Sequence, residues 1–280
     1  MIASFLITLR EGIEAALIVA VVLSYLKKVG AHALLRPVYL GVLTGVLASI
    51  AAGSLFILLS VEFEGTGEQI FEGVTMSVAA VVLTTMIFWM RDNSRAYSES
   101  MKGKVQAALT GKRTLGLTAL VFVSILREGI ETVLFLGSAS FTADGAQTVI
   151  GGTLGIVVAV AVGLAIIKYS VRMNLKAFFS ATGVFLVLFA AGLVARGLGE
   201  FQEAGVITPL IEHVWDTSGF ISDGSSLGTA MSALFGYTAA PSLVQIIGYA
   251  GYWVFVAMWV YRATTMPWLR RVFAAVRPAA

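Results

Sequence analysis

Long apolar stretches separated by short polar segments dominate the chain. A helix needs about 20 mostly apolar residues to cross a bilayer, and seven segments approach or exceed this length: 2–26, 38–60, 69–90, 114–138, 148–168, 177–199 and 242–261. The connection 200–241 is rich in Gly and Ser, and 206–215 within it is a candidate for a short interfacial helix. The pattern predicts an all-α polytopic membrane protein with seven transmembrane helices.

The composition supports a membrane protein over the soluble classes. Hydrophobic residues make up 58% of the 280 residues and charged residues 12%, whereas a soluble domain is about 25% charged. A disordered chain would be far less apolar. The chain has no cysteine, which excludes a disulfide scaffold, a zinc-thiolate site and a thiol nucleophile. Three charged residues in the first span, without a basic region before it, predict a retained helix and not a signal peptide.

The basic residues predict the orientation of the chain. With seven spans, 16 of the 19 Lys and Arg lie on one side: Lys27, Lys28, Arg36, Arg91, Arg95, Lys102, Lys104, Lys112, Arg113, Lys168, Arg172, Lys176, Arg262, Arg270, Arg271 and Arg277. The opposite loops are acidic. The positive-inside rule therefore places the N-terminus outside and the C-terminus in the cytoplasm of a multi-pass plasma (inner) membrane protein. The net charge of +3 reflects this topology, and no nucleic-acid partner is expected.

The chain repeats itself. Leu-Arg-Glu-Gly-Ile-Glu starts at Leu9 and again at Leu126, an offset of 117 residues. Small residues recur every fourth position in the second span and, 110 residues later, in the fifth: Gly41, Gly45, Ser49 and Gly53, then Gly151, Gly155, Ala159 and Gly163. Because each copy has three spans, the second has the opposite orientation, as in the inverted-topology repeats of many transporters.

This repeat predicts the organisation of the chain. A transmembrane domain at 1–262 comprises repeat one (1–91), a cytoplasmic loop (92–113), repeat two (114–201), an outer loop (202–241) and a seventh helix (242–261). The remaining 263–280 is expected to form a basic amphipathic helix on the inner leaflet.

Four glutamates near the middle of the first and fourth spans are the candidate site. Glu11 and Glu14, like Glu128 and Glu131, are three residues apart and share a helix face. Arg10 and Arg127 each precede the second glutamate by four residues. An intramembrane charge costs about 3 kcal/mol. After two Arg–Glu pairs form, two carboxylates remain, which must be protonated or must bind a cation.

The donor type limits the cation. Carboxylates suit iron, manganese, magnesium and calcium. The six repeat spans contain neither Cys nor His, which disfavours copper and zinc. The residues alone leave iron and manganese open.

The doubled Arg-Glu-Gly-Ile-Glu motif resembles the high-affinity iron permease family, which includes the fungal oxidase-coupled permeases and the bacterial EfeU-type iron transporters. The resemblance covers about residues 1–262. It implies iron import across the plasma membrane, with Glu11, Glu14, Glu128 and Glu131 as metal ligands and Arg10 and Arg127 orienting them. Iron would be the substrate, and no cofactor is expected. A separate extracytoplasmic oxidase or iron-delivery protein and a homo-oligomer are the candidate partners besides the lipid bilayer.

Further acidic residues lie at the outer ends of the third and sixth spans and are candidates for guiding cations inward: Glu62, Glu64, Glu68, Glu72, Glu200 and Glu203. A solvated acidic surface is the alternative. Two other functions stay open as competitors. One is a proton-coupled carrier of another divalent cation such as manganese. The other, an intramembrane enzyme, needs a nucleophile or metal-binding His within the spans, and the spans contain no such motif, so no enzyme is predicted.

Overall fold

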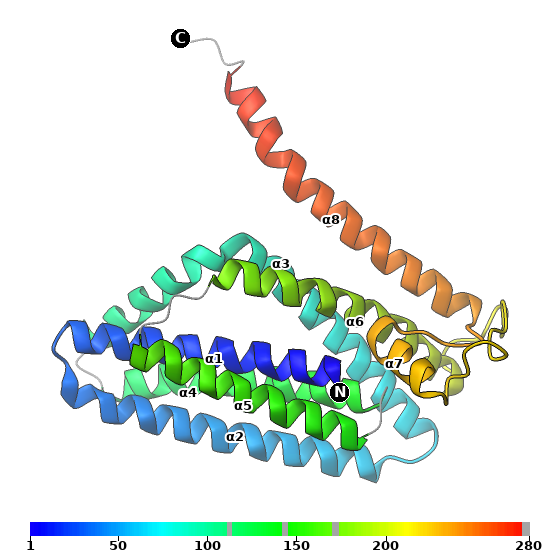
Figure 1. Ribbon diagram of the computed structural model, residues 1–280, viewed down its shortest axis with the longest axis horizontal. Coiled ribbons are helices and arrows are strands. Elements are labelled where there is room, and N and C mark those ends of the chain that lie inside the picture. Colours follow the sequence, from blue (N-terminus) through cyan, green and yellow to red (C-terminus); the bar gives the residue numbers. More distant parts are fainter. Residues whose placement is uncertain (111–113, 142–144, 170–173, 276–280) are drawn as a thin grey trace.

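A computed structural model describes residues 1–110, 114–141, 145–169 and 174–275, without the side chains of 91–102 and 263–275 and a few others. This part of the chain contains helices and no strand. The α-helices are α1 (Ile2–Lys28), α2 (Leu35–Glu62), α3 (Thr66–Thr110), α4 (Thr114–Ser140), α5 (Gly145–Tyr169), α6 (Leu175–Glu203), α7 (Ser226–Phe235) and α8 (Leu243–Ala275) (Figure 1). A short 3₁₀ helix, η1 (His32–Leu34), precedes α2. All seven predicted spans fall almost entirely within helices, namely α1 to α6 and α8.

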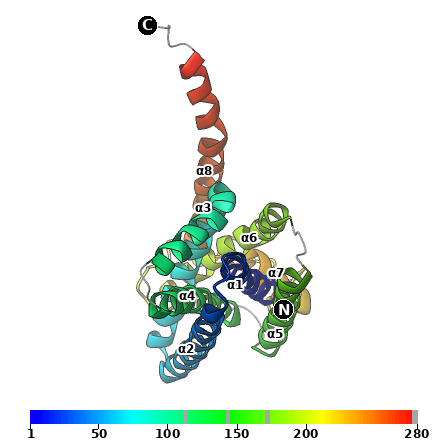
Figure 2. The same ribbon diagram turned by 90° about the vertical axis from the view of Figure 1, so that its left-hand side faces the viewer.

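The six helices of the two predicted repeats pack in pairs that cross between the halves. α1 packs on α5, α2 on α4 and α3 on α6, while α1 and α4 meet in the middle (Figures 1 and 2). The pairing is symmetric between the two halves. If α1, α2 and α3 are exchanged with α4, α5 and α6 in that order, the same four helix pairs result. α8 packs on α6 and then extends away from the other helices.

Individual contacts recur at the same offsets as the sequence repeat. A β-carbon on Gly12 would meet the β-carbon of Ala159, and one on Gly129 would meet the side chain of Ser49. Gly129 and Ala159 are the repeat-related partners of Gly12 and Ser49. The helix backbones approach closely at these points because a small residue faces a small residue, as membrane helix pairs commonly do.

The same contacts give the directions of the helices. Met1 lies beside Gly151 and Ala16 beside Gly163, so α1 and α5 run parallel. The corresponding contacts make α2 and α4 parallel. Since α1 and α2 form a hairpin (Figure 1), α1 and α4 run in opposite directions.

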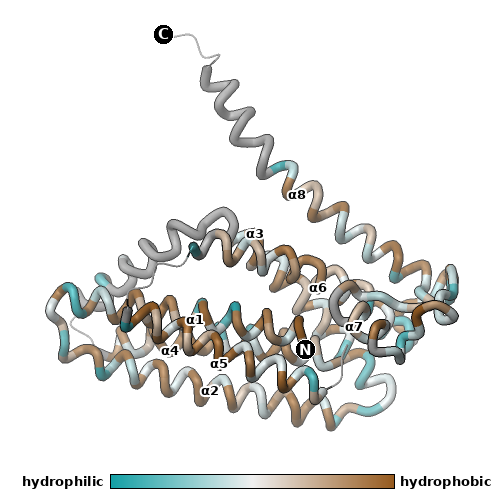
Figure 3. The backbone as a smooth tube through the Cα atoms, in the orientation of Figure 1, coloured by the Kyte–Doolittle hydropathy of each residue, from teal (hydrophilic) through white to brown (hydrophobic). Residues whose placement is uncertain are grey.

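The outer surface of the bundle is strongly apolar. Among the described residues, five helical segments are long and apolar enough to cross a membrane: α2, α5, α6 and the apolar parts of α3 and α8. Large side chains such as Leu58 on α2, Val149 on α5 and Val254 on α8 are more than half exposed. Hydrophobic residues recur along the helices of the bundle (Figure 3). Exposed apolar surface of this extent needs a lipid environment to cover it. α1 and α4 have similar lengths, but each contains three charged motif residues.

Two connections differ from the expectation. α3 continues past the expected end at 91 to Thr110, so most of the 92–113 connection is helical. The candidate helix at 206–215 is wrong, because that segment is irregular and α7 forms further along. Its backbone bonds to a distant segment instead: the Val214 N–H donates to the Pro241 carbonyl at 3.0 Å, and the Leu243 N–H to the Ile211 carbonyl at 3.1 Å. The amphipathic helix expected at 263–280 falls on residues whose side chains the structure does not describe.

Candidate metal centre

Three glutamates of the two motifs meet where α1 contacts α4. Glu11, Glu128 and Glu131 each offer one carboxylate oxygen, and these three oxygens lie within 4.8 Å of one another. All three residues are buried, with exposed fractions of 1%, 4% and 8%. The spacing of Glu128 and Glu131 places both on the face of α4 that meets α1. Carboxylates from two helices therefore converge on one buried point.

Most of these oxygens have no protein partner. Both oxygens of Glu11 and the Oε2 atoms of Glu128 and Glu131 are buried without a hydrogen bond. A buried carboxylate without a partner is costly, and it is retained where it is neutralised or binds a cation. An all-oxygen set of this kind suits a hard or borderline cation. The centre is thus able to hold a metal ion.

The two arginines pair with the second glutamate of their own motif. Arg10 Nε donates to Glu14 Oε1 at 3.1 Å, and Arg127 Nε donates to Glu131 Oε1 at 2.7 Å. Both pairs have the spacing of four residues that brings side chains together on a helix. Each guanidinium thereby fixes one carboxylate of its motif.

The two identical motifs have different surroundings. Glu14 is buried with its Arg10 partner and does not belong to the group of three converging carboxylates. The side chain of Arg10 is 1% exposed, whereas that of Arg127 is 56% exposed. Of the four predicted ligands, the structure therefore brings three together and leaves Glu14 outside this group, while Glu131 belongs to it and also pairs with its arginine.

A second acidic group lies at the packed ends of α3 and α6. Gly73 of α3 contacts Gly197 and Phe201 of α6, which brings Glu72 within electrostatic reach of Glu200, and also of Glu68 and Glu203. The sequence analysis named these four residues among its candidates for guiding cations inward, and the structure gathers them at one end of α3 and α6. Glu62 and Glu64 are exposed at the turn between α2 and α3, and neither acts on Glu72 in this way.

Arg196 of α6 also belongs to this outer group, and sequence reasoning assigned it no role. It is within electrostatic reach of Glu200, Glu72 and Asp223. Of the 19 Lys and Arg, Arg196 is the one that lies neither in the motifs nor on the predicted cytoplasmic side. This exception could have marked it as a candidate functional residue.

The connection after α6 is built around Asp223. The carboxylate of Asp223 accepts the Ala239 N–H at 3.0 and 3.2 Å, and Gly236, at the end of α7, approaches the backbone of Gly192. At the surface, the Ser218 hydrogen bonds hold the pKa of the Asp216 carboxyl below its usual range. This part of the molecule thus carries further negative charge beside the ends of α3 and α6.

Known proteins resemble this chain over most of its length. The Iron permease FTR1 family matches residues 1–273. The ferrous iron permease EfeU of Yersinia pestis is 37% identical over 251 residues, which cover 89% of each chain. That of Escherichia coli O157:H7 is 37% identical over 248 residues, or 88% of this chain and 90% of its own. No solved structure matches significantly.

Proposed function

The chain belongs to the iron permease FTR1 family, and from this membership we propose that it imports ferrous iron through the centre between α1 and α4. Its family is one of permeases with iron as the substrate, so the chain is a transport protein and not an enzyme. The finer steps below, from the site to the route, are our proposal.

The observation that carries the site is the convergence of Glu11, Glu128 and Glu131 with unpartnered oxygens. Four buried carboxylates stand against two guanidinium groups, so the motifs carry two surplus negative charges when all are ionised. One ferrous ion neutralises this surplus. The relatives named above are ferrous iron permeases, which supports the same oxidation state here.

The proposed route begins at the outer acidic group around Glu72 and Glu200. Negative charge there raises the local cation concentration. The ion then loses water to the carboxylates of α1 and α4 and leaves on the cytoplasmic side. An inside-negative potential favours this direction by about 2.3 kcal/mol per charge per 100 mV.

The proposed architecture has seven membrane-spanning helices and two three-helix repeats of inverted topology. The repeat-related contacts of Gly12 with Ala159 and Gly129 with Ser49 support it, as do the opposite directions of α1 and α4. In such transporters one repeat moves against the other around a site near the midplane. The charged motifs in α1 and α4 are tolerable in a membrane because the other helices bury most of them.

Radioactive iron uptake into proteoliposomes tests the proposal. Purified chain would be given ferrous iron with ascorbate, ferric citrate or manganese, in separate reactions. We expect ferrous iron to accumulate, and Glu11→Gln or Glu128→Gln to reduce uptake at least tenfold. Glu212→Gln, at an exposed position of the outer connection, is the matched control and should retain most of the activity.

Two results would contradict the proposal. Manganese uptake without iron uptake would favour the competing divalent-cation carrier, with which the oxygen ligands are also compatible. Undiminished iron uptake by both site variants would move the pathway away from the α1–α4 centre.

A further inference from the structure

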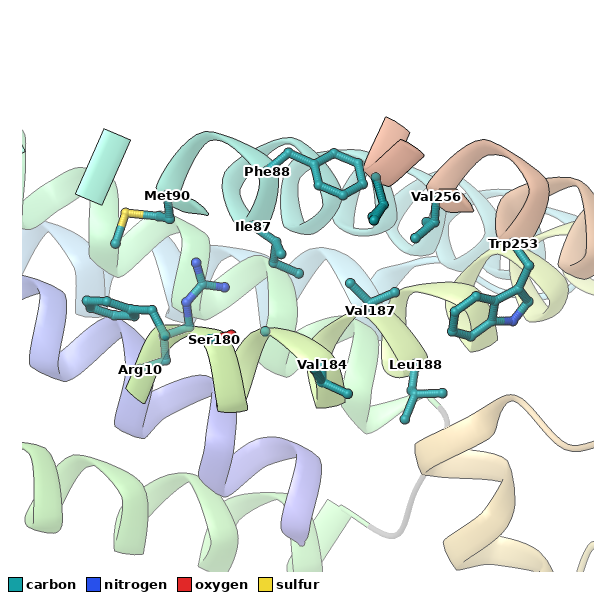
Figure 4. A pocket seen from close by; sticks show the side chains of 13 residues that line it. Arg10, Ile87, Phe88, Met90, Ser180, Val184, Val187, Leu188, Trp253 and Val256 are labelled. Atoms are coloured by element: carbon teal, nitrogen blue, oxygen red, sulfur yellow. The ribbon is translucent and has the colours of Figure 1, made fainter. Parts of the chain in front are cut away.

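A cavity of about 540 Å³ lies beside the metal centre, between α3, α6 and α8, with Arg10 of α1 at one end (Figure 4). Its walls are mostly apolar and include Ile87 and Met90 of α3, Val184 and Leu188 of α6, and Trp253 and Val256 of α8. This volume lies within the range typical of small-molecule sites, about 300–1,000 Å³. The proposed iron route does not use this space.

Arg10 gives the cavity a single positive end. Its side chain is 1% exposed and its Nε is engaged by Glu14, but its Nη1 is buried without a hydrogen-bond partner. In Figure 4 the guanidinium group extends from α1 toward Ile87 and Met90. It is the one charged side chain among the described residues of the lining. Glu14 already pairs with this guanidinium, so what Nη1 lacks is a hydrogen-bond acceptor.

The same features argue against a cation or water as the natural occupant. An iron route needs oxygen ligands along it, whereas this lining offers a guanidinium and the hydroxyl of Ser180. A buried water needs two to four polar partners, which apolar walls do not provide along the length of the cavity. The space suits an apolar body that ends in an acceptor for Arg10.

We propose that this cavity binds one long-chain fatty acid from the membrane, with its carboxylate on Arg10 and its chain between α3, α6 and α8. Arg–carboxylate pairs are among the strong charge-assisted hydrogen bonds. A diacyl phospholipid fits less well, because it brings two chains to one cavity.

Trp253 in the cavity wall provides a direct readout that does not depend on transport. Bromine atoms on an acyl chain quench the fluorescence of a tryptophan that they contact. The full chain in detergent would be titrated with bromostearate, with its methyl ester and with brominated phosphatidylglycerol. The Trp253→Phe variant identifies the part of the fluorescence that belongs to Trp253. We expect saturable quenching of that part by bromostearate, with the ester at least tenfold weaker.

A cavity-filling substitution tests the location. A β-carbon on Gly183 would have Ile87 Cγ2 at 3.5 Å as its nearest neighbour, an ordinary contact, so Gly183→Leu should place the rest of its side chain in the cavity. Gly251→Leu in α8, where nothing lies within 4 Å, is the matched control. We expect Gly183→Leu to weaken the binding of bromostearate at least tenfold and Gly251→Leu to leave it unchanged. Val187→Phe serves the same purpose if Gly183→Leu does not fold.

Three outcomes would overturn the proposal. Equal binding of the acid and its ester would show that Arg10 does not recognise an anion. Unchanged quenching in both cavity-filling variants would place the fatty acid elsewhere. Tighter binding of brominated phosphatidylglycerol than of bromostearate would make the occupant a diacyl lipid. Arg10→Gln should abolish the difference between acid and ester, since it removes the positive charge.

Discussion

Arg10 and Arg127 occupy the same position in identical motifs, yet Arg10 is fully buried and Arg127 is more than half exposed. The cost of losing a member of an ion pair depends strongly on how completely the surrounding protein buries it. A guanidinium removed from Arg10 leaves Glu14 buried without its partner, whereas the side chain of Arg127 is packed against less of the protein. The two arginines therefore differ in what their loss does to the protein.

Arg10→Gln should lower the free energy of unfolding more than Arg127→Gln. Breaking a buried pair typically costs about 3–5 kcal/mol, and Arg127→Gln should cost less because more than half of the Arg127 side chain is outside the packed interior. Denaturation in detergent micelles, followed by circular dichroism, measures both. Arg10→Lys is the control, because it keeps the charge but loses the planar fork. Equal destabilisation by the two Gln variants would contradict this difference in burial.

The carboxylates also differ in expected role, because Glu14 lies outside the converging three. Ferrous iron at 100 times its Kd should stabilise the wild-type chain by about 2.7 kcal/mol. We expect Glu11→Gln and Glu128→Gln to abolish this stabilisation and Glu14→Gln to retain a substantial part of it. Thermal unfolding under anaerobic conditions, with and without iron, measures the effect. Complete loss in Glu14→Gln would mean that all four carboxylates hold the ion together.

Sequence predicted the convergence of the glutamates but not this asymmetry. The doubled motif and its spacing of three residues indicate a shared site between two helices. Two identical motifs cannot indicate which arginine is buried, because burial depends on neighbours far away in the chain. Arg10 borders the cavity that α8 helps to enclose, and α8 has no counterpart in the repeat.

At the scale of the helices, close packing depends on paired small residues. A β-carbon on Gly129 collides with the side chain of Ser49, so Gly129→Ala should destabilise the protein by about 1–3 kcal/mol, as overpacked sites do. Adding Ser49→Gly should restore most of the loss, because residues in contact show coupling energies of about 0.5–3 kcal/mol. Thermal unfolding of the single and double variants tests this prediction.

Gly251→Ala is the control for that cycle, since open space surrounds Gly251. Alanine there should be neutral or slightly stabilising. A double variant no more stable than Gly129→Ala would rule out Ser49 as the residue against which the β-carbon collides.

Hydropathy predicted the long helices and missed the short one. A run of apolar residues predicts a helix where the backbone makes its hydrogen bonds within the same segment, as in α2. The segment 206–215 instead makes backbone hydrogen bonds to a distant part of the chain. Val214 bonds to Pro241, and Ile211 bonds to Leu243. The limits of α7 were readable locally: the Ser225 side chain accepts the Gly228 N–H, and Gly236 ends the helix in the left-handed conformation.

At the scale of the whole molecule, the predicted topology can be tested without first removing native thiols, since the chain has no cysteine. Phe220 lies in the outer connection, and Lys28 lies at the C-terminal end of α1, on the predicted cytoplasmic side. Both positions are exposed, so Phe220→Cys and Lys28→Cys would each carry one accessible thiol. We expect a membrane-impermeant maleimide to label Cys at position 220 in intact cells. Labelling at position 28 should require permeabilised cells. The reverse pattern would invert the proposed orientation.

The sequence repeat predicted that the two halves would be related, but not how they would pack. Hydropathy gives the extent of each span and says nothing of its neighbours. The pairing of α1 with α5 and of α2 with α4 depends on which small residues face each other in three dimensions. It thus required the structure.

This crossed pairing has a consequence for how the protein is made. α1 carries the charges of its motif into the membrane early in synthesis, but its main packing partner α5 begins only at Gly145. At a synthesis rate of about 5–20 residues per second, roughly 6 to 23 s separate the two helices. We therefore expect α1 to need another partner during that interval, such as the insertion machinery or a membrane chaperone, and neither half of the chain to mature on its own.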